Sequence, residues 1–508
     1  MGIIKRQSLK TSIVNYVGVL IGVVFFVFVF PHIISEEYLG LIGLLQNLTF
    51  ILVSLPMLGL AHVLLRFFAV WKKGETASHF NAFSLLVMGA GLLVFATAYY
   101  LLKAPIIALY KTHSALFLPY YLLIIPLVVI QAYSQYFEIY AMVKLRVAVP
   151  AFLREIVTRL LLIFLIFLFA YQFLNEQQFI LGFLLVYLIT FLVLILYSVK
   201  GLQFKAFGYK EYIKGAGFKS QMVYGGGMLL LTIFNNVSNF LDSIILPAYL
   251  GLGVLGIYLR PLVLGQMIQV PYRAISLISI PIIREAIVEN NLQKVKELNK
   301  DIAINLFLIG CFLFSLLIGN TDAIFSLFPA KYIIAKDVLY IIAVGRLLDM
   351  AFGLNSEILN YSKYYKFIVL FAGIMMLLTI GLNLMLIPNY GMNGAALSVT
   401  ISLIIFNLLK TWMIYKKFHF HCFSRKYLTL ILISAAVIGV LHQLPIVQLV
   451  DHHMFFNSIL NIGLRSVVGA LLFIFPTYYF KISPDLNAFI QLIRTGKILK
   501  GGHKLEEL

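Results

Sequence analysis

Residues 179–197 read FILGFLLVYLITFLVLILY, a run without a single charged side chain. At 1.5 Å of rise per residue, a helix of this length is close to the roughly 30 Å of a bilayer's hydrocarbon core. Apolar runs of similar length recur along the chain and are separated by short polar breaks. The sequence therefore predicts a polytopic membrane protein.

The apolar runs predict about fourteen transmembrane helices. Lipid offers no partner for unpaired backbone groups, and the alternating pattern of barrel strands is absent, so the predicted fold is all-α. The expected ranges are 13–30, 39–65, 80–102, 115–137, 151–171, 179–197, 222–246, 252–280, 302–319, 338–354, 367–387, 394–415, 428–444 and 460–480.

Composition excludes several classes of protein. Of the 508 residues 62% are hydrophobic and 12% charged, with a mean hydropathy of +0.98, whereas a soluble domain carries about 25% charged residues. The net charge of +19 is spread over many short loops, so a nucleic-acid partner is not expected. The chain has two cysteines without C-x-x-C spacing, so a disulfide framework is not expected. One basic loop contains His419, His421 and Cys422, and a metal site is not expected there either.

The chain has no phosphate-binding loop, nucleophile elbow, zinc-protease or kinase signature. We therefore expect no enzyme activity and no cofactor. An ion gradient, the membrane potential or the substrate gradient would have to drive any transport.

The distribution of basic residues predicts the topology. With a cytoplasmic N-terminus, most lysines and arginines of the loops fall on the inside, and the opposite set holds only Lys103, Lys111, Lys331 and Lys336. This asymmetry obeys the positive-inside rule. Fourteen spans would make both termini cytoplasmic.

A weak internal repeat indicates how the helices are grouped. Phe30-Pro31 is followed by Gly40, and Leu246-Pro247 is followed by Gly256, at a constant offset of 216 residues. Transporters are often built from duplicated bundles. We expect an N-terminal lobe of six spans (1–199), a basic cytoplasmic linker (200–221), a second lobe of six spans (222–420), and a C-terminal helix pair with a tail (421–508).

Ionisable residues inside expected spans are costly and usually face a bundle interior or a water-filled cavity. Arg260 and Arg273 lie in the eighth expected span and Arg346 in the tenth. Arg346 and Asp349 could neutralise each other at i, i+3, or they could belong to a wetted helix face that Gly353, Glu357 and Asn360 extend. Glu155 and Arg159, at i, i+4, favour a neutralising pair within one helix.

Polar residues also recur on single helix faces. Such stripes either hold helices together or line a cavity, and the sequence leaves both interpretations open. They are Asn235, Asn239 and Asp242 in the seventh span, Gln131, Ser134, Gln135 and Glu138 in the fourth, and Gln266, Gln269 and Arg273 in the eighth.

The arginines indicate an anionic ligand. A guanidinium is always charged, and its planar fork suits two phosphate oxygens at once. A diphosphate head group in a watery cavity would fit such residues.

An ordered set of short motifs resembles the polysaccharide transporter family, the lipid-linked oligosaccharide flippases of the MOP exporter superfamily, which also includes the MATE drug exporters. The resemblance covers most of the chain. Its motifs are Phe30-Pro31, Glu37-Tyr38-Leu39-Gly40, Gly59-Leu60, Arg66-Phe67, Asp242, Leu250-Gly251, Gly256, Tyr258, Pro281, and LIPNYGMNGAA at 386–396, which looks like the loop before the twelfth span.

The resemblance implies two six-helix lobes around a cationic cavity, and alternating access that carries an undecaprenyl-diphosphate-linked glycan to the outer leaflet of the bacterial inner membrane. It implies a monomer, with membrane lipids and other polysaccharide assembly proteins as partners. Arg260, Arg273 and Arg346 would hold the diphosphate. Contacts to sugars or ions would come from Asp242, Asn239, Asn235, Gln266, Gln269, Glu138 and Gln135.

Two alternatives remain open. A MATE-like exporter of small molecules or cations would need acidic groups in its cavity. A membrane-embedded glycan polymerase or ligase would need a sizeable extracytoplasmic loop with catalytic groups, and the expected outer loops are short.

Overall fold

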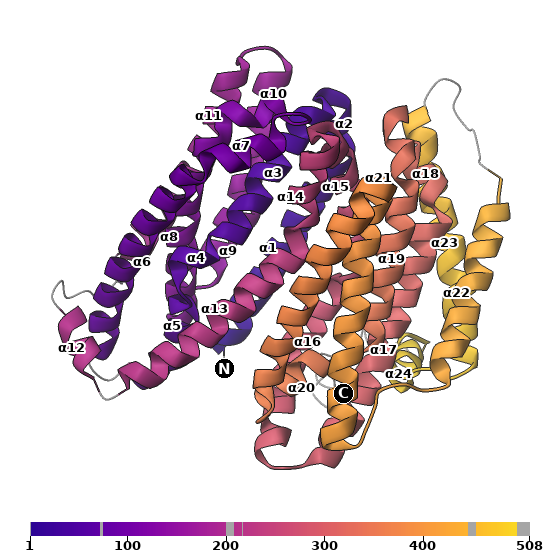
Figure 1. The fold of residues 1–508 in the computed structure, drawn as a ribbon. Helices are drawn as coiled ribbons and strands as arrows, with labels where there is room; N and C mark the ends of the chain where they lie inside the picture. The colour runs from indigo at the N-terminus through magenta and orange to yellow at the C-terminus, as the bar shows by residue number, and fades with distance from the viewer. Residues whose placement is uncertain (1, 72–74, 200–207, 216, 446–453, 495–508) are drawn as a thin grey trace. The chain divides into compact units, whose positions relative to one another are not determined.

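The computed structural model of the protein describes residues 2–71, 75–199, 208–215, 217–445 and 454–494 (Figure 1). All regular secondary structure in these ranges is helical. The chain divides into two compact units, residues 1–260 with 376–395, and residues 261–375 with 396–508. Parts of the predicted linker (200–207 and 216) and the tail 495–508 lie outside the described residues.

The first unit contains most of the N-terminal helices. They are α1 (Gly2–Gly22), the π-helix η1 (Val23–Val29), α2 (Phe30–Ile33), α3 (Glu36–Leu52), α4 (Ser54–Met57), α5 (Leu60–Trp71), α6 (Thr76–Leu101), α7 (Lys103–Tyr110), the 3₁₀-helix η2 (Ala115–Leu123), α8 (Ile124–Val143), α9 (Ala148–Phe152), the π-helix η3 (Leu153–Val157), α10 (Thr158–Ala170), α11 (Glu176–Val199), α12 (Tyr209–Lys214), α13 (Phe218–Phe240), α14 (Asp242–Leu250) and most of α15 (Leu252–Gln266).

The second unit begins within α15. It contains the 3₁₀-helix η4 (Met267–Gln269), α16 (Val270–Val288), α17 (Leu292–Gly319), α18 (Thr321–Phe325), the 3₁₀-helix η5 (Ala330–Ala335), α19 (Lys336–Ala351), α20 (Asn355–Tyr361), much of α21 (Tyr365–Phe418), α22 (Lys426–Gln443), α23 (Met454–Tyr479) and α24 (Pro484–Arg494).

Eleven helices of the described residues are long and apolar enough to cross a membrane. The all-α, multi-pass fold is confirmed, but the count of fourteen is not. The element α21 consists of two helices that meet at Gly391 and cover the expected spans 367–387 and 394–415, so it counts once among the eleven, and the π-helix η3 interrupts the range 151–171. Only 16 residues form α19, which covers most of the range 338–354.

The stretch 386–396, expected to begin with a loop, lies inside α21. Only Gly391 leaves helical geometry there, with φ 56° and ψ −131°. Few residues other than glycine adopt this left-handed backbone without strain. The rings of Tyr364 and Phe418, at the two ends of α21, lie 5.6 Å apart, so the chain reverses direction and the expected loop is a tight turn at Gly391.

The repeat seen in the sequence coincides with a close helix crossing inside the first unit. A Cβ on Gly40 of α3 would lie 1.9 Å from the Leu252 carbonyl oxygen, and one on Gly256 of α15 would lie 2.0 Å from the Glu36 carbonyl oxygen. Both pairs, 36 with 252 and 40 with 256, differ by the repeat offset of 216. The two repeat-related helices thus meet backbone to backbone in a reciprocal contact that only glycine permits.

The described part of the expected linker is anchored by α12. The buried ring of Tyr212 is surrounded by Trp71, Phe80, Phe83 and Phe218, with ring centroids 5.0–6.0 Å away. These rings come from the end of α5, the start of α6 and the start of α13. The described part of the linker therefore packs α12 between the start of α13 and the helices α5 and α6.

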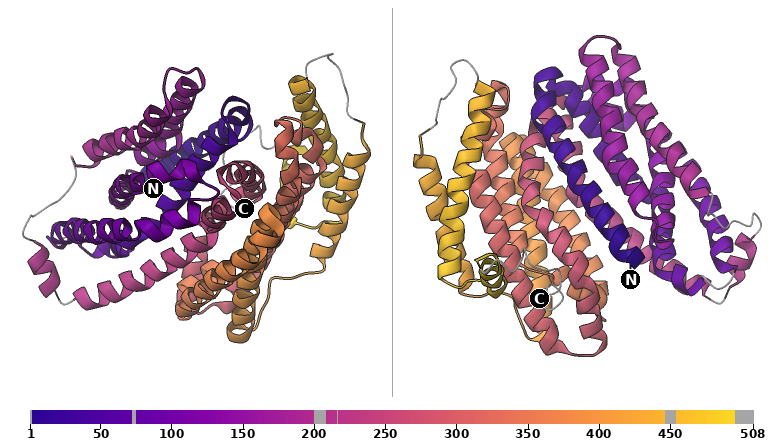
Figure 2. Two further views of the ribbon diagram at one scale, coloured as in Figure 1. Left: turned by 45° about the horizontal axis from the view of Figure 1, so that its top comes forward. Right: turned by 180° about the vertical axis from the view of Figure 1, so that it is seen from behind.

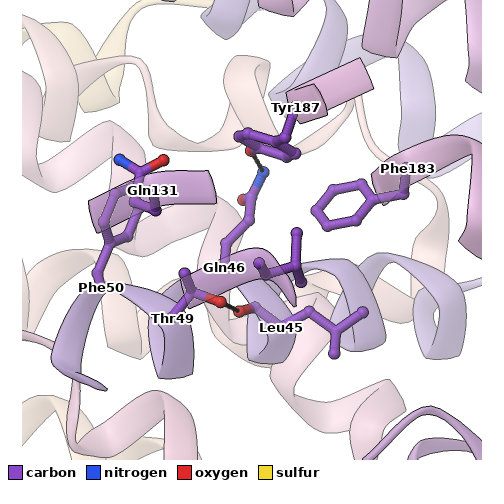
Figure 3. Close-up of a pocket in the computed structure, with 8 residues that line it drawn as sticks. Leu45, Gln46, Thr49, Phe50, Gln131, Phe183 and Tyr187 are labelled. Atoms are coloured by element: carbon purple, nitrogen blue, oxygen red, sulfur yellow. Dashed lines mark hydrogen bonds between the residues drawn. The ribbon is translucent and has the colours of Figure 1, made fainter. Parts of the chain in front are cut away.

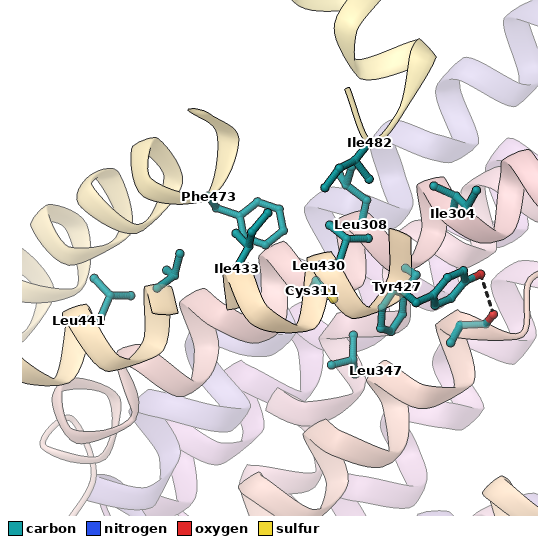
Figure 4. Packing of buried hydrophobic residues seen from close by; sticks show 13 residues of the cluster. Ile304, Leu308, Cys311, Leu347, Tyr427, Leu430, Ile433, Leu441, Phe473 and Ile482 are labelled. Carbon is teal, nitrogen blue, oxygen red and sulfur yellow. Dashed lines mark hydrogen bonds between the residues drawn. The ribbon is translucent and has the colours of Figure 1, made fainter. Parts of the chain in front are cut away.

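The helices α22 and α23, which cover the expected C-terminal pair, pack against α17 within the second unit (orange-yellow and yellow in Figures 1 and 2). Figure 4 shows their shared hydrophobic cluster, in which the rings of Phe307 and Tyr427 stack 4.6 Å apart and Cys311 is fully buried. The Tyr427 hydroxyl donates to the Ala351 carbonyl at 3.0 Å. This core extends to the end of α19 and stabilises the helix that carries Arg346.

Candidate functional site

Four ionisable side chains gather inside the second unit. They are Arg346 and Asp349 on α19, Glu357 on α20 and Lys410 on α21. Arg346 and Lys410 are only 8% and 4% exposed. Two cations and two carboxylates balance each other formally, as buried charges must if the unit is to remain stable. We call these four residues the charged quartet.

Side-chain amides connect the quartet around Asp349. Arg346 Nη1 donates to Gln269 Oε1 at 3.1 Å, and the amide nitrogen of Gln269 donates to Asp349. Asn407 Nδ2 donates to the other Asp349 oxygen at 2.6 Å. The i, i+3 spacing on α19 therefore places Arg346 and Asp349 on either side of Gln269, which bridges them.

Lys410 is the member of the quartet that the sequence reasoning missed. Its ammonium donates to Ser356 Oγ at 2.8 Å and lies 4.2 Å from the Phe406 ring centroid. It also interacts electrostatically with Asp349 and Glu357. The available signal was a lysine inside the expected span 394–415, several residues before the basic loop begins.

Glu357 is held by a phenol from α16. The Tyr272 hydroxyl donates to both Glu357 oxygens, at 2.9 and 3.0 Å. The turn before α20 depends on Gly353, with φ +59°, where an added Cβ would lie 2.7 Å from the Ala303 Cβ. Asn299 of α17 accepts from the Leu354 amide at 2.9 Å, which satisfies a backbone donor where α20 begins.

The predicted arginines do not all lie in one unit. Arg273 and Arg346 belong to the second unit, where Arg273 is exposed one helical turn after Gln269. Arg260 is buried and belongs to the first unit. Gln266, half-buried near the end of α15, belongs to the second unit. Among these residues, Gln269 and Arg346 are joined directly by a hydrogen bond.

Asp242 lies in the first unit and is almost fully buried. It accepts hydrogen bonds from the Tyr258 hydroxyl and, at 2.7 Å, from the Ser243 backbone amide. Asn239, which is exposed, donates to the Asn235 carbonyl at 2.8 Å, within α13.

A second set of ion pairs connects α8 with η3 and α10 in the first unit. Arg154 Nη1 lies 2.5 Å from Glu138, and its Nε lies 3.0 Å from Glu155. The predicted pair is confirmed, with Arg159 Nη2 2.7 Å from Glu155. Arg159 also donates to the Gly18 carbonyl of α1. Gln135 lies half-buried on α8, on the same helix as Glu138.

The first unit also contains a small pocket between α3, α8 and α11 (Figure 3). Gln46 Nε2 donates to the Tyr187 hydroxyl at 2.9 Å, and Gln131 and Phe50 lie beside them. The volume of this cavity is about 20 Å³. This space suits a water molecule or one hydroxyl group, and it is too small for a sugar ring.

Within the part of the chain that the structure describes, no group of three or more histidine, cysteine or acidic residues could hold a metal ion.

Comparisons with known structures identify the fold. The lipid II flippase MurJ, in an inward closed conformation, matches with a TM-score of 0.65 and 17% identity, over 92% of this chain and 98% of that chain. An inward-facing multidrug resistance MATE family transporter of the MOP superfamily matches with a TM-score of 0.62 and 13% identity, over 81% and 98%. The Vibrio cholerae MATE transporter VcmN, in its bent form, has a TM-score of 0.53 and 14% identity, over 82% and 98%.

At these identities the likeness shows the fold alone. The search among curated proteins found no significant match. The family model described as "polysaccharide biosynthesis protein", however, matches residues 4–287, more than half of the chain. This chain is therefore a multi-pass membrane protein with a transporter fold and belongs to the polysaccharide biosynthesis protein family.

Proposed function

We propose that this protein is a flippase that moves a lipid-linked oligosaccharide from the inner to the outer leaflet of the bacterial inner membrane. The carrier proposed is undecaprenyl diphosphate, and the mechanism is alternating access driven by an ion gradient, the membrane potential or the substrate gradient. The family and the MurJ-like fold support a lipid-linked substrate. Both termini are proposed to be cytoplasmic and the protein to be a monomer, with membrane lipids and other assembly proteins as partners.

The observation that carries the proposal is the surplus of positive charge around the quartet. Arg273 follows Tyr272, whose hydroxyl donates to Glu357, so it adds a third cation to the two cations and two carboxylates of the quartet. Asp349 and Glu357 already accept hydrogen bonds from Asn407 and Tyr272. Exposed Arg273 therefore keeps a guanidinium for an anionic group, and a diphosphate supplies oxygens that suit it. Arg346, fixed by Gln269, provides further positive potential.

A MATE-like cation exporter fits the described charges less well. An organic cation requires a carboxylate that is not already engaged, and each acidic group described above has a hydrogen-bond or ion-pair partner. These pairs are Glu138 with Arg154, Glu155 with Arg159, Asp242 with Tyr258, Asp349 with Asn407 and Glu357 with Tyr272.

A glycan polymerase or ligase has less support because the described connections between helices are short. On the side expected to be extracytoplasmic, α2 and α3 are joined by two residues and α14 and α15 by one. Residues 446–453, which include His452 and His453 of the expected outer loop between the ranges 428–444 and 460–480, lie outside the described residues. Family and fold are those of transporters, and absence of enzyme activity remains a prediction.

The proposal is tested by deleting the gene and measuring lipid-linked glycan on the cytoplasmic leaflet. Glycan should accumulate there, and the wild-type gene should restore export. Arg273→Ala and Arg346→Ala should lower export at least about tenfold, as expected when a charge-assisted contact worth roughly 1.5–3 kcal/mol is lost. Arg260→Ala tests the third predicted arginine in the same assay.

Lys366→Ala is the matched control, because it removes one exposed positive charge from α21 near its start. It should restore export fully. No accumulation after deletion, or full export by both Arg273→Ala and Arg346→Ala, would contradict the proposal and favour export of small molecules.

A further inference from the structure

Arg66 of α5 is an exposed arginine whose guanidinium lies against aromatic rings. The guanidinium carbon is 4.2 Å from the centroid of the Tyr224 ring of α13 and 5.6 Å from the centroid of the Phe67 ring. The rings of Phe67 and Tyr224 meet edge to face, 5.8 Å apart. Both helices belong to the first unit, so this arrangement includes no residue of the charged quartet.

The packing of α5 against α13 fixes this arrangement. A Cβ on Gly59, just before α5, would lie 2.1 Å from the Gly225 carbonyl oxygen, so the two backbones are in contact there. One turn before Arg66, His62 Nε2 lies 3.1 Å from Thr232 Oγ1 and forms a hydrogen bond to α13. The ring that carries the guanidinium is therefore positioned by the packing of two helices.

A ring contact engages the face of a guanidinium and leaves its N–H groups, which lie in the plane, available for acceptors. Within the described residues, the contacts of Arg66 are to rings, and its guanidinium has no hydrogen bond or ion pair. Arg154 and Arg159 of the same unit are instead paired with Glu138 and Glu155. Arg66 thus presents an oriented fork of donors without an acceptor from the described residues.

The position of this fork suits a lipid phosphate. Two phosphate oxygens can accept from one guanidinium side by side. Arg66 directly follows the expected span 39–65, at the end proposed to be cytoplasmic, where the head groups of the inner leaflet lie. A Cβ on Gly227, one turn after Tyr224, would have no atom within 4 Å, so this part of α13 is uncovered.

We propose that Arg66, oriented by Tyr224 and Phe67, binds the phosphate of a lipid head group at the cytoplasmic end of the first unit. Arg66 donates two N–H groups to phosphate oxygens, and the Tyr224 ring holds the guanidinium in place for them. The diphosphate of the proposed carrier lipid and the phosphate of an anionic phospholipid share this chemistry. Only the role of the site in transport rests on the proposed flippase function.

The test is photo-crosslinking of the purified full-length protein in detergent with a benzophenone-bearing farnesyl diphosphate, followed by peptide mass spectrometry. Peptides from α5 and α13 should be labelled in the wild type. Arg66→Ala should lower this labelling at least about tenfold, as expected when a charge-assisted contact is lost, and should leave labelling of the second unit unchanged. Arg146→Ala is the matched control, because it removes another exposed arginine of the first unit, and it should leave all labelling unchanged.

Conservative variants separate the role of the ring from that of the charge. Tyr224→Phe keeps the ring and should retain the labelling of α5 and α13, whereas Tyr224→Ala should lower it severalfold. Arg66→Lys keeps the charge without the planar fork, so it should also lower the labelling. Thermal unfolding of each variant shows that any loss of labelling comes from a folded protein.

Competition identifies the source of the phosphate. Protection of α5 and α13 by excess unlabelled farnesyl diphosphate, but not by phosphatidylglycerol, would assign the site to the carrier lipid, and protection by both would assign it to lipid phosphates in general. Unlabelled α5 and α13 in the wild type, or equal labelling in the wild type and Arg66→Ala, would overturn the proposal. So would equal losses in Arg66→Ala and Arg146→Ala. Crosslinking needs no transport, so it decides the proposal even if the flippase function fails.

Discussion

Asp242 is 1% exposed, and its negative charge is held by one phenol and by the backbone at the start of α14. Tyr258→Phe removes the phenol's donor while keeping the ring. We expect a loss of about 1–3 kcal/mol in the free energy of unfolding, because a buried charged acceptor loses a hydrogen bond. Thermal unfolding in detergent measures this.

Tyr249→Phe is the matched control, because Tyr249 is 42% exposed on α14. It should leave the unfolding temperature unchanged. Equal behaviour of the two variants would show that the Tyr258 hydroxyl contributes nothing to Asp242.

Asp322 of α18 lies outside the candidate membrane spans, and Lys336 Nζ lies 2.8 Å from its carboxylate. The hydrogen bond and the charge of Lys336 lower the pKa of Asp322 below 3.8, although partial burial acts against them. A lowered folded-state pKa stabilises the protein above the unfolded-state pKa, and this stability is lost as pH falls through the folded-state value.

Because Asp322 is half exposed, the ion pair should contribute less than about 1 kcal/mol. Wild type should therefore be slightly more stable than Asp322→Asn at pH 7, and the difference should vanish as the pH falls below the folded-state pKa of Asp322. Thermal unfolding of both proteins across that range checks it. A constant difference at every pH would contradict the role of the ion pair.

At the scale of residues, the sequence identified which side chains are costly in a membrane, including Arg346, Gln269 and Asp242. It could not identify the partners, since the Gln269 bridge between Arg346 and Asp349 depends on how η4 packs against α19. Lys410 was missed because it lies near the end of an apolar span, where a lysine is also expected to reach the membrane surface.

At the scale of elements, the crossing of α3 and α15 is the most constrained contact in the first unit. Gly43 adds to it, because its Cβ would lie 2.3 Å from a Leu259 methyl carbon, again at the repeat offset. Gly40→Ala or Gly256→Ala would force the two backbones apart. We expect a loss of about 1–3 kcal/mol or more in stability, measured by thermal unfolding.

Gly226→Ala is the matched control inside α13, where no atom lies within 4 Å of an added Cβ. It should be neutral or stabilise the protein by up to about 1 kcal/mol, because alanine is the better helix former. The account of the crossing would be wrong if Gly40→Ala and Gly226→Ala had the same effect.

The repeat could be predicted at this scale from Phe30, Gly40, Leu246 and Gly256, because a close crossing requires glycine and leaves a spacing in the sequence. Helix ends were less predictable. Pro388 and Gly391 are typical of a loop, and the two helices of α21 do meet in a turn at Gly391, but the turn is so tight that Pro388 still lies in helical geometry. The π-helices η1 and η3 leave no such signature, since they contain ordinary apolar and charged residues.

At the scale of the whole molecule, composition and the length of the apolar runs were sufficient to predict an all-α membrane protein, because lipid permits few alternatives for a chain with 62% hydrophobic residues. The motifs then indicated the family, which the match over residues 4–287 confirms. The division into four parts stays a prediction. Contacts between residues far apart in the chain, such as the quartet, required the structure.

The central claim is that the protein flips a lipid-linked glycan, and reconstitution tests it most directly. Purified protein is placed in liposomes whose outer leaflet carries a polyprenyl-diphosphate-linked oligosaccharide, and a membrane-impermeant oxidant then measures how much glycan remains accessible. Wild type and Lys366→Ala should move glycan to the protected leaflet, and Arg273→Ala should do so at least about tenfold more slowly. Glycan that stays accessible with the wild type, in liposomes where the same protein transports an organic cation, would contradict the claim.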